Sequence, residues 1–183
     1  MCIRDRFLSP YTNKRTDEYG GGFAQRMRFP MEIVQGIKES LGRDFPISFR
    51  FSADEFVHGG IDVSEAQRMA QAMEKAGVDA LHVSAGIYES LPTLLEPMSY
   101  AQGWRCHLAA EIKKAVTVPV IAVGVIREPA FAETCSGRAV INSCLWNNRR
   151  SPSPSSWQAR TGSCRQILPA HSSGPSSSRS PVS

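Results

Sequence analysis

The side chain best suited to chemistry in this 183-residue chain is Arg50, within the stretch Ile47-Ser-Phe-Arg-Phe-Ser-Ala-Asp-Glu55. Apolar and polar residues alternate here, which is the period of a strand with two unlike faces. A guanidinium on a core strand is costly unless it meets an anion or an electron-rich partner. Two interpretations follow: a structural salt bridge to Asp54 or Glu55, or a cation that meets a ligand.

Three other residues could take part in a site. His82 belongs to a second strand, predicted over residues 79–84, and could contact a ligand. Gly124 ends a third strand; its backbone could approach a phosphate at the next helix start, or it could simply allow a tight turn. Tyr88 follows the second strand, where it could line a pocket or only pack the loop down.

The elements that must position these residues alternate along the chain. Apolar periodicity predicts helices over residues 24–41, from Ser64 to about residue 76, over 105–116, and from about residue 128. The predicted strands cover residues 47–55, 79–84 and 118–124. This order predicts a parallel α/β sheet, in which sites lie where the carboxyl ends of the strands open into loops.

The alternation within each strand predicts which face each side chain occupies. One phase is expected to face the helices, and it holds Phe49, Leu81 and Ile121. The other phase is expected to face inward, and it holds Arg50, His82 and residues 122–124. A capping box of Ser64 and Gln67 is expected to begin the second helix.

Composition narrows the class of protein. The hydrophobic content of 42% and the charged content of 21% are ordinary for a globular protein. No apolar run approaches the ~18–20 residues of a membrane span, so no membrane partner is expected. Five cysteines in odd number, without the spacing of metal ligands, predict a reducing, cytoplasmic setting and no metal site in this chain.

The net charge of +4 belongs to the end of the chain. From Ile141 onward there are 13 serines, five prolines, five arginines and no acidic residue, so this segment carries +5 and the rest −1. We therefore expect no nucleic-acid partner. The predicted domain covers residues 7–139, and residues 140–183 are predicted to be a disordered or frame-shifted tail. Residues 1–6 show no pattern and are interpreted as a leader or the ragged edge of a fragment.

Several motifs resemble those of a known family. Phe7-Leu-Ser-Pro-Tyr-Thr-Asn-Lys-Arg-Thr-Asp-Glu-Tyr-Gly-Gly21 closely resembles the signature loop of the Old Yellow Enzyme family of NADH:flavin oxidoreductases. The resemblance continues through residues 26–29, 49–56, 59–60, 77–84 and 118–124. Residues 96–103 and 125–129 look most like the enoate-reductase and 2,4-dienoyl-CoA-reductase branch.

The resemblance implies a fold and a cofactor. The family is a TIM barrel of eight βα units that holds FMN, and this chain would be a partial barrel with about strands 5–7. Arg50 would lie against the N1 and C2 carbonyl edge of the flavin, where a cation stabilises the negative charge left by hydride addition. Gly124 would contact the FMN phosphate through its backbone. Val125 stands where the family often has Arg or Asn, so only a backbone contact carries over.

The implied reaction passes hydride from NAD(P)H through FMN to the activated C=C bond of a small unsaturated carbonyl or enoyl substrate. His82 and Tyr88 are the candidate substrate contacts, and no catalytic acid can be assigned within this chain. The eighth-strand Gly-Arg phosphate clamp is missing after residues 137–139. Cys144 and Cys164 do not reproduce the iron–sulfur cluster motif of the larger branch. An iron–sulfur centre and an oligomer are therefore expected only of a full-length parent.

Two alternatives remain open at this point. The chain could be a catalytically inactive half-barrel that binds a partner, or a different phosphate-binding barrel. As an enzyme fragment with unpaired sheet edges, the chain on its own is expected to be inactive.

Overall fold

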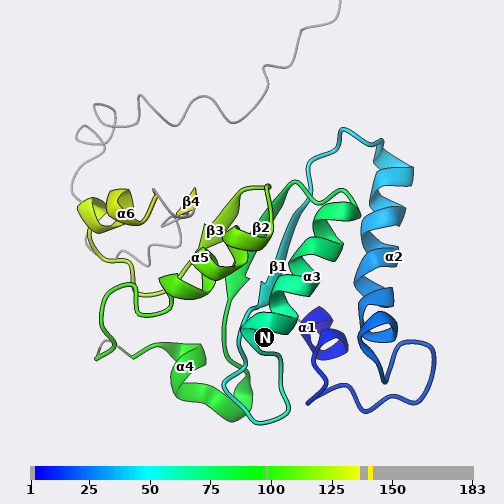
Figure 1. The fold of residues 1–183 in the computed structure, drawn as a ribbon, viewed down its shortest axis with the longest axis horizontal. Coiled ribbons are helices and arrows are strands. Elements are labelled where there is room, and N and C mark those ends of the chain that lie inside the picture. The colour runs from blue at the N-terminus through cyan, green and yellow to red at the C-terminus, as the bar shows by residue number, and fades with distance from the viewer. Residues whose placement is uncertain (1–2, 98, 137–139, 142–183) are drawn as a thin grey trace, which may run out of the picture. The chain divides into compact units, whose positions relative to one another are not determined.

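A computed structural model describes residues 3–97, 99–136 and 140–141 of the chain. Helices and strands alternate along it (Figure 1), in the order α1 (Ile3–Leu8), α2 (Phe23–Leu41), β1 (Ser48–Ser52), α3 (Val63–Lys75), β2 (Ala80–Ser84), η1 (Tyr88–Ser90), α4 (Leu91–Leu95), α5 (Cys106–Ala115), β3 (Val120–Ala122), α6 (Pro129–Ser136) and β4 (Val140–Ile141). No helix of the described part is long and apolar enough to cross a membrane.

The strands form one parallel sheet in the order β1-β2-β3-β4. The parallel α/β architecture predicted from the order of elements is confirmed. Helices α3 and α5 lie against one face of the sheet, as Figure 1 shows. The short strand β4 adds a position beyond the three predicted strands, and it begins just after the predicted domain boundary at residue 139. The remainder of the predicted tail lies outside the described residues.

The strand register shows which side chains share a face. Phe49 pairs with Leu81, and Leu81 pairs with Val120; all three are buried under the helices. On the opposite face, Arg50 pairs with His82, and His82 pairs with Ile121.

The predicted phase of the third strand is therefore wrong by one residue. Ile121 lies on the Arg50 face, whereas Ala122 is 2% exposed and belongs to the core with Val120. The predicted third strand is almost continuously apolar, so no polar residue marked its outer phase.

Helix α2 carries the predicted apolar stripe along most of its length. Met27 and Val34 are buried in the core, but Leu41 at the end of the helix is exposed. Pro30 is buried within the helix, which continues through it. Gly42 ends the helix, because its φ of 92° is a backbone conformation that glycine adopts without strain.

Helix α3 starts differently from the prediction. Its N-cap is Asp62, whose carboxylate accepts the Glu65 N–H at 2.8 Å, so the expected Ser64–Gln67 capping box is not the cap. Its buried face is as predicted, since Ala66, Met69 and Met73 are all in the core. The cap places Glu65 in the first turn of the helix, where its carboxylate also forms an ion pair with Arg26.

Short helices occur where only loops were expected. Helix α1 overlaps the start of the signature loop; Leu8 is buried, and the ring of Phe7 packs 4.4 Å from that of Phe29 on α2. After β2, η1 and α4 occupy part of the loop predicted over residues 85–103. All three of these helices, α1, η1 and α4, are too short for apolar periodicity to reveal them.

Candidate functional site

Arg50 lies on the face of the sheet that the helices leave open. Its side chain is exposed, and its Nη2 donates to the Ser84 hydroxyl at the end of β2, at 3.3 Å. Arg50 forms no ion pair with a carboxylate of the described residues. Asp54 instead accepts the Phe56 N–H at 2.7 Å, and Glu55 accepts the Ser9 hydroxyl at 2.7 Å. The salt-bridge interpretation of Arg50 is therefore not supported.

His82 is the neighbour of Arg50 on the same face, half-way along β2. Burial lowers the pKa of the imidazole below its usual 6.5, and the positive charges of Arg50 and Arg105 lower it further. His82 is therefore neutral at pH 7. Its Nε2 is buried and has no hydrogen-bond partner among the described residues. A buried ring nitrogen without a partner is costly, which indicates a place for a ligand or another polar group.

An ion pair within the segment between β2 and α5 reaches the end of β3 through its arginine. Arg105 is 7% exposed, and its Nη2 lies 2.6 Å from Oε2 of Glu96. Arg105 Nε donates to the carbonyl of Val123 at 3.1 Å, and Trp104 Nε1 donates to Oε1 of Glu96 at 2.8 Å. Burial raises the pKa of Glu96 and lowers that of Arg105, although each partner favours the charge of the other.

Gly124 and Val125 follow β3 in a sharp turn with positive φ values of 112° and 44°. A Cβ on Gly124 would lie 2.3 Å from both Arg105 Nε and Glu96 Oε1. The close approach that makes glycine necessary here is thus to the Arg105–Glu96 pair, and not only to a ligand as the sequence suggested. For Val125, a β-branched residue, positive φ is a strained conformation.

Backbone strain gathers at this edge of the sheet. Among the described non-glycine residues, positive φ occurs at Phe56 (55°), Glu96 (50°) and Val125 (44°). One follows each of the strands β1, β2 and β3. Trp104 links two of them, because its ring packs 5.8 Å from that of Phe56 and its indole N–H binds Glu96. Strain of this kind persists where surrounding contacts hold it, often at functional sites.

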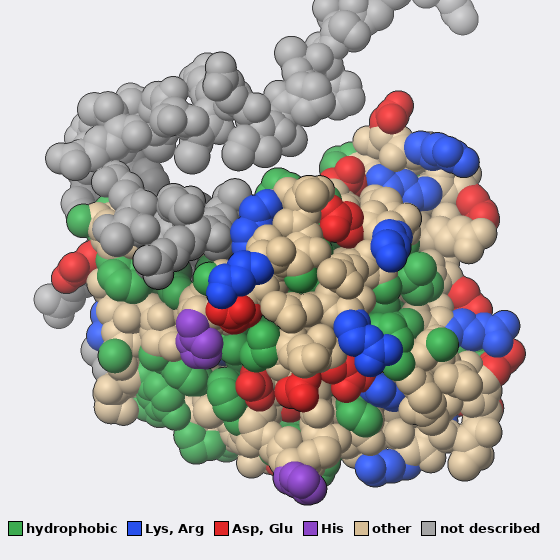
Figure 2. All heavy atoms as spheres, viewed as in Figure 1, with side chains coloured by type: hydrophobic (Ala, Val, Ile, Leu, Met, Phe, Trp, Pro, Cys, Tyr) green, Lys and Arg blue, Asp and Glu red, His purple; other side chains and the backbone are tan. Residues whose placement is uncertain are grey.

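Tyr88 begins η1, just after β2, and its side chain is 58% exposed. Leu91 and Leu95 of α4 are also exposed, and Figure 2 shows hydrophobic side chains gathered over this helix at the lower left. The structure thus places Tyr88 at the carboxyl edge, and no hydrogen bond or ring contact of the described residues joins it to Arg50 or His82. A substrate contact by Tyr88 or His82 remains a prediction.

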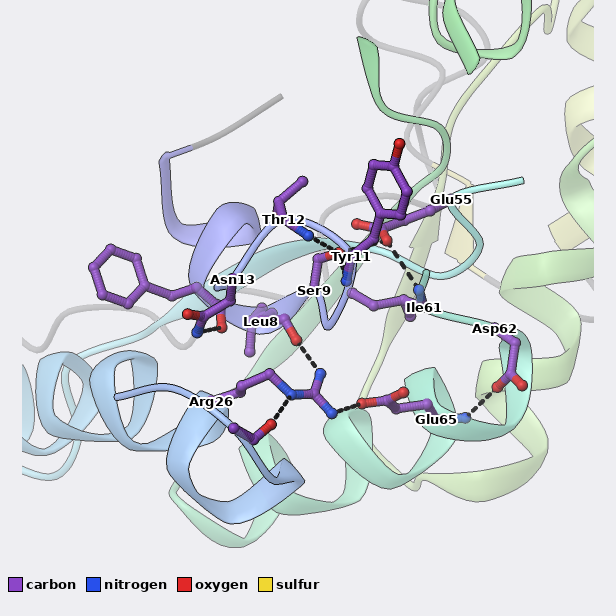
Figure 3. A network of polar contacts seen from close by, with 12 residues as sticks. Leu8, Ser9, Tyr11, Thr12, Asn13, Arg26, Glu55, Ile61, Asp62 and Glu65 are labelled. Carbon is purple, nitrogen blue, oxygen red and sulfur yellow. Dashed lines mark hydrogen bonds and ion pairs between the residues drawn. The ribbon is translucent and has the colours of Figure 1, made fainter. Parts of the chain in front are cut away.

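The signature loop is anchored by a network of its own (Figure 3). Arg26 of α2 donates to the carbonyls of Leu8 and Gly21 and forms an ion pair with Glu65 at 2.6 Å. Nearby, Glu55 accepts the Ser9 hydroxyl at 2.7 Å and the Ile61 N–H at 2.9 Å. These contacts fix the loop against α3 and the segment after β1.

The sequence predicted part of this site. Arg50 and His82 come together as neighbours, and Gly124 and Val125 lie at the same carboxyl edge. His58 and His107 are exposed, away from this site. The sequence missed Glu96, Trp104 and Arg105, because nothing in their spacing marks a contact between loop residues.

No group of three or more potential metal ligands occurs in the described ranges. Cys106 begins helix α5, and Cys144 and Cys164 lie outside those ranges.

A parallel sheet with helices on one face, and with a candidate site in the loops at its carboxyl edge, is the layout of a (β/α)-barrel. Residues 3–142 match the family described as NADH:flavin oxidoreductase / NADH oxidase, and the chain belongs to that family. The match starts within residues 1–6, the segment where the sequence showed no pattern. The family excludes the alternative of an unrelated phosphate-binding barrel and implies the use of flavin and NADH.

Curated relatives agree with this assignment. The chain is 63% identical over 136 residues to an NADH oxidase of Thermoanaerobacter brockii, covering 73% of this chain and 21% of the relative. It is 44% identical to a metal reductase of Desulforamulus reducens (70% and 19%) and 36% identical to a cinnamate reductase of Clostridium sporogenes (71% and 22%). The chain spans about a fifth of the length of these relatives.

Solved structures share the fold. A 2-naphthoyl-CoA reductase in complex with 2-naphthoyl-CoA superposes with a TM-score of 0.70 at 33% identity, over 76% of this chain and 22% of the other. An Old Yellow Enzyme homologue from Zymomonas mobilis, at 20% identity and a TM-score of 0.54, shows the fold alone, over 76% and 38%. The described sheet is thus part of a TIM barrel, as the sequence predicted.

Proposed function

We propose that this chain carries part of the flavin site of an FMN-dependent ene-reductase, which reduces the activated C=C bond of a small unsaturated carbonyl or enoyl substrate. The observation that carries the proposal is Arg50, an exposed cation with no carboxylate partner among the described residues, beside the buried and unpartnered Nε2 of His82. Both face the side of the sheet that the helices leave open.

The residues present fit a flavin. Arg50 offers positive charge to an electron-rich ring edge, and His82, neutral at pH 7, offers one uncharged hydrogen-bonding nitrogen. The backbone turn at Gly124 and Val125 would hold the phosphate. A bound FMN would supply the hydride transfer from NAD(P)H to the β-carbon of the alkene.

The substrate class rests on two kinds of support. A cinnamate reductase is among the relatives, at 36% identity, and residues 96–103 and 125–129 resemble the enoate-reductase branch. The proton that completes reduction of the alkene is assigned to no residue of this chain. We expect the chain by itself to bind flavin weakly and to be inactive, because its sheet supplies one side of a barrel.

Titration of the purified chain with FMN, followed by quenching of flavin fluorescence, tests the proposal. We expect saturable binding that Arg50→Gln weakens about tenfold, since a charge-assisted contact contributes about 1.5–3 kcal/mol. Arg43→Gln is the matched control, because Arg43 is an exposed arginine that precedes β1, at the opposite end of the strand. Equal affinities of the two variants, or no saturable binding by the parent chain, would refute the proposal.

A second candidate is a catalytically inactive half-barrel that docks a partner. Strand β1 favours it, because in the described sheet β1 pairs only with β2 and leaves its other edge unpaired. Such a protein has no use for a flavin. Saturable FMN binding that depends on Arg50 would therefore decide against it.

A further inference from the structure

We propose that Glu96 and Arg105 are positioning residues that fix the backbone of residues 123–125 where the cofactor phosphate binds. This inference rests on the proposed function, because it assigns the pair a role in selecting FMN over a flavin without phosphate. Neither side chain is required to touch the cofactor. The pair acts through the turn that follows β3.

Arg105 connects three segments at the carboxyl edge of the sheet. Its Nε binds the carbonyl of Val123 at 3.1 Å, directly before the turn. Its Nη1 lies 3.4 Å from the carbonyl of Ala85, just after β2, and 3.5 Å from that of Thr93 in α4. One rigid guanidinium thus sets the end of β3 relative to the end of β2.

Glu96 holds this guanidinium in place. Its Oε2 lies 2.6 Å from Arg105 Nη2, and its Oε1 accepts the Trp104 N–H at 2.8 Å, so both carboxylate oxygens are engaged. Glu96 reaches this position only with a positive φ of 50°. The strain indicates that the surrounding contacts, and not local preference, determine where the carboxylate lies.

The turn itself is shaped around the pair. The space beside the Gly124 Cα is filled by Arg105 Nε and Glu96 Oε1, each 2.3 Å from where a Cβ would lie. On the other side of the turn, the carbonyl of Val125 accepts the N–H of Gly103 at 3.1 Å. Residues 123, 124 and 125 are therefore each held by the segment 96–105.

A purely stabilising role explains the pair poorly. Buried ion pairs are often no more stabilising than apolar residues of the same volume, because desolvation offsets the attraction between the charges. Here the positive charge of Arg50 also lowers the pKa of Arg105, which means that it disfavours the charged form of Arg105. Besides any contribution to stability, a pair that determines the geometry of three backbone segments is suited to positioning a ligand-binding turn.

The decisive experiment compares FMN with riboflavin, which lacks the phosphate. Dissociation constants of both flavins are measured by fluorescence quenching for the full chain, Glu96→Gln and Arg105→Gln. We expect each variant to bind FMN about tenfold more weakly and riboflavin within about twofold of the parent. Glu65→Gln, which alters the other buried arginine–glutamate pair, is the matched control and should weaken both flavins equally or neither.

A measurement without flavin keeps the inference testable if a variant folds poorly. Amide hydrogen exchange followed by NMR should show the Gly103 N–H, which binds Val125, exchanging about tenfold faster in Glu96→Gln. The Leu81 N–H, which binds the Pro119 carbonyl within the sheet, should be unchanged. Equal acceleration at both amides would mean general loosening and would overturn the inference.

The outcomes separate the two proposals. If the parent chain binds FMN and the variants lose FMN and riboflavin to the same extent, the positioning role fails and the proposed function stands. If the parent chain binds no flavin, the proposed function fails and the phosphate role of the pair fails with it. The exchange of Gly103 then still decides whether the pair fixes the turn.

Discussion

Two partly buried arginine–glutamate pairs stabilise this protein at different places, and their chemistry is nearly the same. Arg26 and Glu65 lie 2.6 Å apart, as do Arg105 and Glu96. Both arginines are largely buried, and both also donate to backbone carbonyls of neighbouring loops. Interaction type alone therefore does not distinguish the roles of the two pairs.

The surroundings of the two pairs distinguish their roles. Arg26 ties the N-terminal loop to helix α3, within a network of polar contacts (Figure 3). Arg105 lies at the carboxyl edge of the sheet, where strained residues gather and where its charge helps lower the pKa of His82. We infer that the first pair maintains the fold and the second maintains a site. The predictions below test this division.

Removing Arg26 should have a large effect on stability. Arg26→Ala leaves Glu65 and the carbonyls of Leu8 and Gly21 without their donor, which should lower the free energy of unfolding by about 3–5 kcal/mol. Urea unfolding followed by circular dichroism measures this. Arg28→Ala, which removes exposed ion pairs on the same helix, should change little. Similar losses in the two variants would contradict the structural role of Arg26.

Gly124→Ala should be more damaging than an alanine at a glycine with open space. Gly42 also has positive φ, but nothing lies within 4 Å of its Cβ position, so Gly42→Ala meets backbone strain alone, about 1–3 kcal/mol. At Gly124 the methyl group also overlaps Arg105 and Glu96, which should add about 1–3 kcal/mol. Equal unfolding free energies for the two variants would show that Arg105 and Glu96 shift at little cost to make room for the methyl group.

The pH dependence of stability should have opposite signs for two glutamates. Burial raises the pKa of Glu96 above its usual 4.5, so its contribution to stability is present below pH 4.5 and is lost as the pH rises through the raised pKa. Hydrogen bonds from Thr117 lower the pKa of Glu74, so its contribution is present above pH 4.5 and is lost as the pH falls through the lowered pKa.

Urea unfolding of the parent chain, Glu96→Gln and Glu74→Gln between pH 7 and pH 4 measures both contributions. As the pH falls, the parent should gain stability relative to Glu96→Gln and lose it relative to Glu74→Gln. A parent that loses stability relative to Glu96→Gln would mean that attraction to Arg105 outweighs the burial of the carboxylate.

The smallest expected effect is on the titration of His82. Arg105→Gln removes a nearby cation, so the pKa of the imidazole should rise toward 6.5 while remaining lowered by burial and by Arg50. NMR titration of the ring protons detects this change. Arg26→Gln should leave the titration unaltered, and a shift of equal size in both variants would remove the electrostatic difference between the two pairs.

The sequence predicted the sheet and its direction because alternation in β1 and periodicity in α3 report burial directly. It failed for Ile121, since an apolar strand carries no mark of its phase. It also missed the Asp62 cap, because Ser64 and Gln67 have the spacing of a capping box two residues later.

The candidate site was predicted only where regular structure positions it. Arg50 and His82 are neighbours because parallel strands in register make them so. Glu96 and Arg105 meet through a loop whose path depends on a positive φ and on tertiary contacts that no local pattern encodes. The reason for Gly124 was likewise incomplete, because its close neighbours are those two side chains.

The reduction potential of bound FMN tests most directly the claim that the carboxyl edge of this sheet is a flavin site with Arg50 as its cation. The potential is measured for the parent chain, for Arg50→Gln and for the control Arg43→Gln, under flavin-saturating conditions. Loss of the Arg50 charge should lower the potential by on the order of 30 mV, equivalent to about 1.4 kcal/mol for two electrons, with Arg43→Gln unchanged. Equal potentials in all three proteins would contradict the assignment of Arg50 to the flavin.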